Sequence, residues 1–461
     1  MNTPQFTTAS LTQLTSGRLI GADVEFTSVS TDSRTLSKGA LFVALHGPNF
    51  DGHEYIQTAI ARGASAALVS REVNVALPQV LVPEVLAGLS QFACTWRRQF
   101  SFPVIGVTGS NGKTTAKEML GSILAQRGAC LVTRGNLNNH IGVPLTLLRL
   151  NATHQSAVIE MGANHRREIA ALTALAEPDI GLVTNAGAAH LEGFGGLEGV
   201  AQGKGELYLA LPPTGTAIIN ADDRYADYWR AHCATKNMIS FGIEHPADFT
   251  ARNIVAHHTA QGAQTSFELH APQGVITVNL QLVGTHNVRN ALGAAAAATA
   301  AGATLGDIQA GLNAMRPVGG RLQTKAAIHG AALIDDSYNA NPSSVQAGLD
   351  ALQNLGGRRW LIFGDMLELG PDAARLHADM GAYARSTGIE RLLAVGEYTP
   401  HTVAAFGEGA EWFASLDALI AVAQRAITPN VTVLIKGSRG NRLERVAAAL
   451  ALNTETADAT H

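Results

Sequence analysis

The chain alternates short apolar runs with amphipathic segments along most of its length. Residues 104–107 form an apolar run interrupted by one glycine, which is typical of a short buried strand. The next segment, 114–126, carries apolar side chains three and four positions apart, the spacing of one helix face. A further helix is expected at 53–62. Other apolar runs predict strands at 40–45, 66–69, 157–160, 180–184, 217–220, 332–335, 360–363, 392–395 and 431–435.

Strands that alternate with helices favour parallel sheets covered by helices on both faces. The segment 249–283 differs, because its alternating and β-branched residues predict a small antiparallel extension. A turn-rich linker at 316–321 precedes a renewed alternation of strands and helices, and the polar tail after residue 449 is expected to fray. We therefore predict an α/β fold with three domains: 1–83, a small N-terminal α/β domain; 84–315, a central P-loop domain with a parallel sheet; and 316–461, a Rossmann-like domain. The last lacks a Gly-x-Gly-x-x-Gly fingerprint, so a dinucleotide site is not supported.

Composition narrows the class of protein. A chain of 461 residues exceeds one core, and 46% hydrophobic with 15% charged residues is typical of a globular protein. The net charge of -4 argues against a nucleic-acid partner. Three cysteines far apart predict reduced thiols, and the first residues lack the basic start and apolar core of a signal peptide. The longest weakly apolar run, 291–303, is too short to cross a bilayer. We expect a cytoplasmic enzyme without a membrane partner and, since no coiled-coil pattern is present, a monomer.

A phosphate-binding loop lies between the strand at 104–107 and the helix at 114–126. Its glycines let backbone N–H groups turn toward an anion, and the helix N-terminus adds its dipole. Lys113 can reach the outer phosphates and Thr114 can bind Mg²⁺. The strict pattern has a glycine where this chain has Val107, so the flanking strand and helix supply the confirming context. The predicted nucleotide contacts are Gly109, Ser110, Asn111, Gly112, Lys113, Thr114 and Thr115.

Other polar residues follow the predicted strands, where ligands bind in parallel sheets. Glu160 ends one strand, and beside a phosphate loop a Mg²⁺ role is favoured over a solvated acid. His190 lies in a glycine-rich segment and could equally cap or pack. Lys204 reads as a surface lysine from composition alone.

Six stretches occur in an order that resembles one known family. They are Thr108-Gly-Ser-Asn-Gly-Lys-Thr-Thr115, Glu160-Met-Gly-Ala-Asn164, residues 185–190, Lys204, His286-Asn-Val-Arg-Asn290 and Lys436-Gly-Ser-Arg439. Together they resemble the Mur ligases, ATP-dependent amide-forming enzymes of peptidoglycan synthesis, over nearly the whole chain. Residues 188–195, 335–342 and 363–370 resemble the members that join D-alanyl-D-alanine to UDP-N-acetylmuramoyl-tripeptide. The string Asp-Asn-Pro-Arg, usual in the diaminopimelate-adding relative, is absent.

The resemblance implies a catalytic arrangement. ATP would phosphorylate the substrate carboxylate, and an amine would attack the resulting acyl phosphate. Lys113 would neutralise the γ-phosphate, while Thr114 and Glu160 would hold one Mg²⁺. His190 and a carbamylated Lys204 would help to hold a second Mg²⁺, since carbamylation turns a cationic lysine into an oxygen ligand.

The resemblance also implies a nucleotide site between the second and third domains. Asn287 and Asn290 would meet adenine, although Asn287 could instead cap a helix. Arg321 would contact the phosphates. Asp336 would bind ribose with Tyr338 and Asn341 nearby, but sequence cannot separate it from its neighbour Asp335.

The UDP-peptide and the dipeptide would occupy the remaining motifs. Asp32, Ser33 and Arg34 resemble the uridine side, and Asn138 with Asn139 resembles a diphosphate contact. Turn formation is the alternative for both groups. Lys436, Ser438 and Arg439 could grip peptide carboxylates or be solvated at the start of a helix.

Two other functions stay open on the residues alone. A related ligase adds the third amino acid to UDP-N-acetylmuramoyl-dipeptide, and a nucleotide-gated binding protein would hydrolyse ATP without forming a bond. The third residue of the tripeptide is not encoded in any motif of this sequence.

Overall fold

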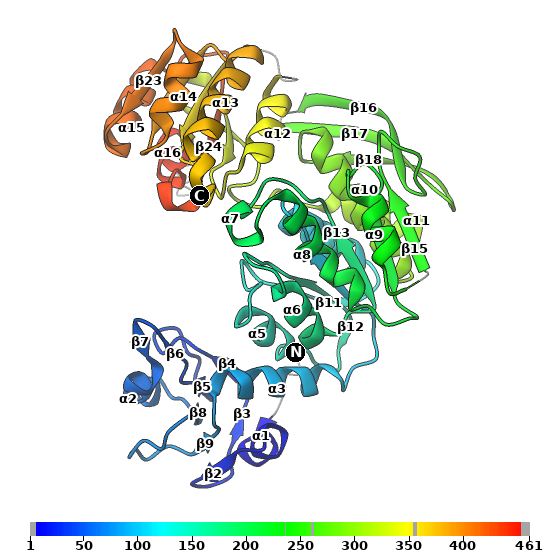
Figure 1. Ribbon diagram of the computed structural model, residues 1–461, viewed down its shortest axis with the longest axis vertical. Coiled ribbons are helices and arrows are strands. Elements are labelled where there is room, and N and C mark those ends of the chain that lie inside the picture. The colour runs from blue at the N-terminus through cyan, green and yellow to red at the C-terminus, as the bar shows by residue number, and fades with distance from the viewer. Residues whose placement is uncertain (1–5, 236, 260–261, 354–356, 453–461) are drawn as a thin grey trace, which may run out of the picture.

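The computed structural model describes residues 6–235, 237–259, 262–353 and 357–452, so the tail beyond residue 452 lies outside the described residues. Three α/β units follow one another along the long axis of the molecule (Figure 1), coloured blue, cyan to green, and yellow to red. The predicted three-part α/β fold is confirmed. No helix among the described residues is long and apolar enough to cross a membrane.

The N-terminal unit is built on a five-stranded sheet of order β2-β9-β8-β5-β4. Two of its three inner strands, β5 (Ala40–Val43) and β8 (Ala66–Val69), are fully buried, which confirms the apolar runs predicted there. The helix predicted at 53–62 begins as a 3₁₀ turn, Gly52–Tyr55, before α2. The elements are β1 (Phe6–Thr7), α1 (Thr8–Thr15), β2 (Arg18–Ile20), β3 (Glu25–Phe26), β4 (Ser28–Ser30), β5 (Ala40–Val43), β6 (His46–Gly47), β7 (Phe50–Asp51), α2 (Ile56–Ala61), β8 (Ala66–Val69) and β9 (Gln79–Leu81).

The helix α3 (Val85–Arg97) joins the first two units. Its Phe92 ring packs on Phe6 and Phe26, with ring centroids 5.0 Å and 6.2 Å away. The same hydrophobic core continues into the central unit. The hydrophobic core is continuous across residue 83 and so does not define a boundary there. The bounds of the three domains stay predictions.

The central sheet has the order β11-β12-β10-β13-β14-β15 and is parallel throughout. Side chains alternate along each strand, so Val104 belongs to one core and Ile105 to the other. Helices α4, α10 and α11 contribute to the second core, and α5, α6 and α8 to the first. The elements are β10 (Val104–Thr108), α4 (Lys113–Leu124), β11 (Ala129–Val132), α5 (Gly142–Leu147), β12 (His154–Glu160), α6 (Glu168–Ala176), β13 (Ile180–Val183), α7 (Leu191–Phe194), α8 (Leu197–Leu209), β14 (Thr216–Asn220), α9 (Ala226–His232) and β15 (Asn237–Phe241).

The strand order of the central sheet brings the candidate site residues together. β10 pairs with β12 on one side and β13 on the other, so three strand ends that carry motifs lie side by side. Val107 is opposite Glu160, and Thr108 is opposite Val183. The phosphate loop, Glu160 and the segment after Val183 therefore meet at one edge of the sheet.

The segment 249–283 forms the predicted antiparallel extension of three strands. It precedes two helices that return to pack on α4. The elements are β16 (Thr250–Thr259), β17 (Gly262–Ala271), β18 (Gly274–Leu280), α10 (Thr285–Ala300) and α11 (Leu305–Ala314).

The C-terminal unit is a six-stranded sheet of order β19-β20-β24-β21-β22-β23. The four predicted strands are confirmed and are mutually parallel where they pair. Two edge strands were not predicted: β19, which is antiparallel, and β23. The elements are β19 (Gln323–Ala326), β20 (Ala332–Asp336), α12 (Pro342–Gln353), β21 (Arg358–Gly364), α13 (Ala373–Ser386), β22 (Arg391–Val395), α14 (Thr399–Phe406), β23 (Ala410–Phe413), α15 (Leu416–Ala426), β24 (Val431–Lys436) and α16 (Glu444–Leu450).

Candidate nucleotide and catalytic site

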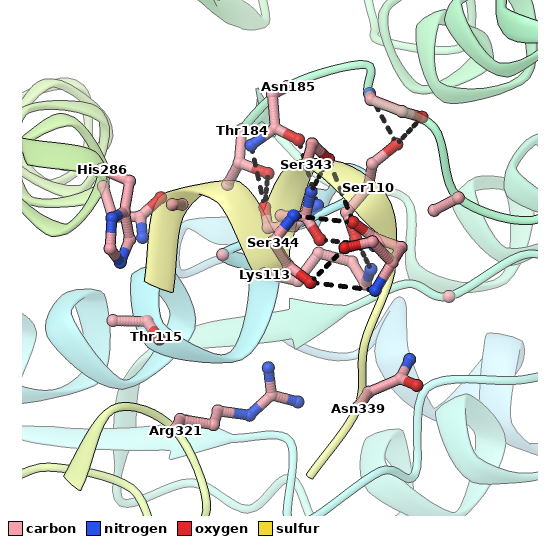
Figure 2. Close-up of a pocket in the computed structure, with 18 of the residues that line it drawn as sticks. Ser110, Lys113, Thr115, Thr184, Asn185, His286, Arg321, Asn339, Ser343 and Ser344 are labelled. Carbon is pink, nitrogen blue, oxygen red and sulfur yellow. Dashed lines mark hydrogen bonds between the residues drawn. The ribbon is translucent and has the colours of Figure 1, made fainter. Parts of the chain in front are cut away.

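A cavity of about 810 Å³ lies where the central and C-terminal units meet. The phosphate loop, the ends of β12 and β13, the start of α10 and the start of α12 all contribute side chains to its wall. Figure 2 shows Lys113 and Ser110 facing Ser343 and Ser344, with Arg321 on another side of the space. This arrangement suits a ligand held by both units.

The two loop glycines are required by close neighbours as well as by backbone conformation. Gly109 has φ 142° and Gly112 has φ 79°, values that favour glycine. A Cβ on Gly109 would lie 2.0 Å from Thr184 Oγ1, and one on Gly112 would lie 2.3 Å from Asn290 Oδ1. The loop is therefore packed directly against β13 and α10.

Lys113 folds back over the loop. Its Nζ donates to the carbonyl oxygens of Gly109 at 2.7 Å and Ser110 at 3.1 Å. Burial lowers the pKa of Lys113 to about 8, with Arg321 acting in the same direction and Glu160 opposing it. Lys113 thus shares one electrostatic environment with Glu160 and Arg321.

Thr184 and Asn185, which follow β13, hold the phosphate loop in place through hydrogen bonds. Thr184 Oγ1 and Asn185 Nδ2 both donate to the Asn111 carbonyl oxygen, at 2.6 Å and 3.0 Å. Ser110 Oγ donates to the Gly187 carbonyl oxygen at 3.0 Å. These anchors were absent from the predicted contacts, although their place directly after a strand was the signal that could have identified them.

Glu160 is buried, with a relative exposure of 2%, and lines the cavity. Its Oε1 accepts a hydrogen bond from Asn138 Nδ2 at 2.8 Å, while its Oε2 accepts no hydrogen bond from any residue in the described part of the chain. The nearest cation is Lys117 Nζ, 3.7 Å from Oε2. Lys117 is fully buried and was not singled out in the sequence.

The hydroxyl-bearing residues after Lys113 differ in position. Thr115 lines the cavity, whereas Thr114 is buried and is not among the described lining residues. The metal role of Thr114 stays a prediction.

His190 and Lys204 lie near Lys113. His190 has a left-handed backbone, φ 54°, and its Nδ1 forms an ion-pair contact with Glu368 of the C-terminal unit. Burial lowers the pKa of His190. Lys204 is 1% exposed; its Nζ donates to the Ala163 carbonyl oxygen at 3.2 Å and lies 4.9 Å from the centre of the Phe194 ring.

No ion pair is formed by Lys204 within the described part of the chain. Burial lowers its pKa to about 7, and the charge of Lys113 contributes to the shift. A lysine in this environment is a neutral amine for much of the time at neutral pH. Such an amine can react with CO₂, and the carbamate would replace a buried cation by an anion.

The donor set fits magnesium better than a transition metal. No group of three or more His, Cys, Asp or Glu side chains that could hold a metal ion occurs among the described residues. Mg²⁺ usually takes only one or two carboxylates from the protein and completes its shell with phosphate oxygens and water. Glu160 Oε2, which accepts no hydrogen bond from the described residues and lies close to the phosphate loop, is a donor of that kind.

The residues predicted for adenine lie together on α10. Asn290 Nδ2 contacts Asn287 Oδ1 at 3.3 Å, and Asn287 Nδ2 donates to the Val283 carbonyl oxygen at 2.8 Å. Both residues line the cavity beside His286. The second bond uses part of the hydrogen-bonding capacity of Asn287, so Asn290 has more left for a ligand.

The structure separates Asp335 from Asp336. Asp336 lines the cavity and pairs with Lys436 Nζ at 2.5 Å, whereas Asp335 pairs with Lys325 at 2.8 Å. Burial raises the pKa of Asp336. Lys436, predicted for a peptide carboxylate, therefore faces the cavity with Asp336 as its partner.

Tyr338 contacts two arginines. The guanidinium carbon of Arg321 is 4.2 Å from the ring centre, and that of Arg439 is 5.1 Å away. Ser438 is buried, accepts from the Leu367 N–H at 2.9 Å and donates to the Ala340 carbonyl oxygen at 3.3 Å. Ser438 thus holds two loops together.

The residues predicted to bind the UDP part of the substrate lie in two separate regions of the structure. Asn138 and Asn139 line the central cavity, where Asn139 Oδ1 also accepts the N–H groups that open α5. Asp32, Ser33 and Arg34 follow β4 in the N-terminal unit and do not line the cavity. The exposed Arg34 lowers the pKa of Asp32 to about 2 through a bidentate contact at 2.9 Å and 2.8 Å.

These features define a P-loop nucleotide-binding protein whose site is completed by a second α/β unit. The chain matches three domains of one family: the Mur ligase family catalytic domain at residues 25–94, the Mur ligase middle domain at 107–298, and the Mur ligase glutamate ligase domain at 320–439. The chain belongs to the Mur ligase family.

Relatives and solved structures agree on this family. The UDP-N-acetylmuramoyl-tripeptide--D-alanyl-D-alanine ligase of Escherichia coli (strain K12) is 44% identical over 450 residues, covering 97% of this chain and 98% of the relative. A crystal structure of MurF from Acinetobacter baumannii has a TM-score of 0.90 at 35% identity, covering 97% and 99% of the two chains. MurF from Thermotoga maritima, solved in complex with ADP, has a TM-score of 0.81 at 27% identity, covering 92% and 96%.

Proposed function

We propose that this protein is an ATP-dependent, ADP-forming ligase that joins D-alanyl-D-alanine to UDP-N-acetylmuramoyl-tripeptide in peptidoglycan precursor synthesis. The observation that carries the proposal is the cavity between two units that holds Lys113, Glu160 and Arg321 together. The near full-length similarity to UDP-N-acetylmuramoyl-tripeptide--D-alanyl-D-alanine ligases favours this substrate pair over that of the relative that adds a third amino acid. A cytoplasmic location and a monomeric state stay predictions.

The reaction needs a better leaving group than a carboxylate provides. The γ-phosphoryl group of ATP passes to the tripeptide carboxylate, which gives an acyl phosphate and ADP. The dipeptide amine attacks the acyl carbon, loses a proton and expels phosphate. Lys113 and Arg321 stabilise the charge that spreads over the phosphoryl oxygens.

Magnesium ions, when bound, would neutralise part of the phosphate charge. Glu160 with Thr114 would hold one ion, and His190 with carbamylated Lys204 would hold a second. The carbamate forms when the neutral Lys204 amine bonds to the carbon of CO₂ and releases one proton. The burial of Lys204 without a carboxylate partner supports this assignment.

The three units divide the substrates between them in this proposal. Residues 1–83 bind the UDP-sugar through Asp32, Ser33 and Arg34, and 84–315 bind ATP. Residues 316–461 complete the nucleotide site and receive the dipeptide at Lys436 and Arg439. Adenine rests against Asn287 and Asn290, and ribose against Asp336.

The function is tested by phosphate release with the two substrates supplied separately and together. Release that requires both UDP-N-acetylmuramoyl-tripeptide and D-alanyl-D-alanine, with a pentapeptide product seen by mass spectrometry, is the expected result. Release that needs neither substrate would instead identify a nucleotide switch. Release with UDP-N-acetylmuramoyl-dipeptide and a single amino acid would identify the third-residue ligase.

Tyr338 offers a test of the arginine arrangement. Tyr338→Leu removes the ring that faces Arg321 and Arg439, and two cation–π contacts of this kind predict a loss of about 5- to 30-fold in kcat/KM for ATP. Tyr338→Phe keeps the ring and is expected to stay close to the wild type. Equal losses in the two variants, measured by steady-state ADP formation, would show that the hydroxyl rather than the ring matters.

A further inference from the structure

Both backbone hydrogen-bonding groups of Asn111, in the phosphate loop, are satisfied by residues of the central unit. Its N–H donates to Asn185 Oδ1 at 3.0 Å, and its carbonyl oxygen accepts from Thr184 and Asn185. With both backbone groups satisfied inside the central unit, only the side chain is available for another partner.

That side chain reaches across to the C-terminal unit. Asn111 Nδ2 donates to Ser343 Oγ at 2.8 Å, and Asn341 Nδ2 donates to Asn111 Oδ1 at 2.7 Å. The partners are 230 and 232 positions away in the sequence and lie at the start of α12. Figure 2 shows Ser343 directly over the phosphate loop. We call Asn111, Asn341 and Ser343 the amide clasp.

The C-terminal half of the clasp is itself fixed. Asn341 is 8% exposed, and its Oδ1 accepts from Ser343 Oγ at 3.0 Å and from the Ser344 N–H at 2.9 Å. The Asn341 amide therefore cannot rotate without losing bonds on both sides. The clasp joins two rigid supports rather than two mobile side chains.

Gly187 provides a second, independent sign that this contact is built into the fold. A Cβ on Gly187 would lie 2.9 Å from Ser343 Oγ and 3.4 Å from Asn111 Nδ2. Its backbone is outside the left-handed region, so conformation does not demand glycine there. Glycine is needed there because a larger residue would crowd the Ser343 and Asn111 side chains.

We propose that Asn111 and Ser343 are positioning residues that dock the C-terminal unit on the phosphate loop. The proposal rests on the ligase function given above, because docking matters when ATP and the dipeptide are held by different units. Through the clasp, the phosphate loop fixes the position of the C-terminal unit, which binds the dipeptide amine. The step that needs both units then depends most on the clasp, while the phosphate loop of the central unit still holds the nucleotide when the clasp is broken.

The test compares Ser343→Ala with Ser344→Ala. Ser343→Ala removes the acceptor of the Asn111 bond, whereas the hydroxyl of Ser344 bonds, among the residues that the structure describes, to the Asn341 backbone of its own unit. We expect Ser343→Ala to lower kcat/KM for D-alanyl-D-alanine by about 10-fold, as for one buried polar group left unpaired. The Kd of ADP, measured by calorimetry, is expected to weaken by less than about threefold, since the loop amides and Lys113 are untouched and only the contributions of Arg321 and Asp336 from the C-terminal unit are loosened.

Hydrogen–deuterium exchange supplies a readout that does not depend on turnover. Ser343→Ala is expected to speed amide exchange in residues 107–115, in the other unit, while Ser344→Ala affects only the start of α12. Unchanged exchange in 107–115, or equal kinetic losses in the two serine variants, would overturn the clasp. A tenfold weaker Kd of ADP in Ser343→Ala would also overturn it, because Ser343 would then be a nucleotide contact. Failure of the wild type to use the dipeptide would overturn the proposed function instead, and the exchange measurement would still decide on the clasp.

Discussion

Lys204→Ala is expected to lower kcat by about a thousandfold, the scale of losing one charge-stabilising group in a closed site. The side chain is 1% exposed and lies near Lys113 and His190, where a carbamate would supply an anionic oxygen. Alanine can neither carry a carbamate nor fill its place. The Kd of ADP is expected to stay within about threefold, because the loop amides that grip phosphate do not involve α8.

Phosphate release and calorimetry measure the two quantities separately. Lys325→Ala is the matched control, since Lys325 of β19 pairs with Asp335 of β20 and neither residue lines the cavity. Added acetate is expected to restore part of the activity of Lys204→Ala, because a small carboxylate can enter the vacated space. Wild-type activity in Lys204→Ala would remove the carbamate from the mechanism.

The pH dependence follows from the same lysine. Burial lowers the pKa of Lys204 from 10.5 to about 7, so its amine is cationic below that pH and neutral above it. Only the neutral amine reacts with CO₂. The carbamate signal from ¹³C-labelled bicarbonate, followed by NMR on nucleotide-free protein, is therefore expected to grow as pH rises from about 6 to 8. A signal that falls over this interval would contradict the assignment.

Sequence patterns were sufficient where local signals and burial agree. The strand predicted at 66–69 is a buried apolar run and was located to the residue, and the one predicted at 392–395 begins one residue earlier, at Arg391. The edge strands β19 and β23 were missed because their side chains are mostly half-buried or exposed, which leaves no apolar run to detect. Edge strands are defined by a neighbour in space rather than by their own composition.

The candidate site shows the same division between local and long-range information. The loop around Lys113 was predicted from neighbouring residues alone. The choice between Asp335 and Asp336 needed the register of β20 against β24, which places Asp336 opposite Lys436. No local pattern contains that pairing.

Lys117 shows why a buried functional neighbour can escape detection. It stands one helical turn after Lys113 on α4, and a lysine in a helix is usually solvated, although every position of this helix is buried or half-buried. Its burial depends on β11 and β12 lying beside that helix. Only the three-dimensional arrangement places its ammonium near Glu160.

Lys117→Met is expected to cost about 3 kcal/mol of folding free energy, because removing one member of a buried ion pair leaves the other charge uncompensated. Lys117 is 0% exposed; its Nζ donates to the Thr133 carbonyl oxygen at 2.8 Å and lies 3.7 Å from Glu160 Oε2. Methionine fills the space but supplies neither charge nor hydrogen bond. For a domain of this size the loss corresponds to a fall in Tm of about 6–12 °C.

The double variant Lys117→Met/Glu160→Gln separates charge from packing. If the unpaired carboxylate causes the loss, removing its charge is expected to recover at least about half of it, a coupling that a double-mutant cycle measures. Ser122→Ala is the control on the same helix, since it deletes one hydrogen bond, 2.7 Å long, to the Gly311 carbonyl oxygen and leaves Glu160 alone. Additive losses in the double variant, or a fall in Tm no larger than that of Ser122→Ala, would show that Lys117 acts through its contacts with the Thr133 carbonyl oxygen and with Glu118, 2.8 Å away, and not as the counter-ion of Glu160.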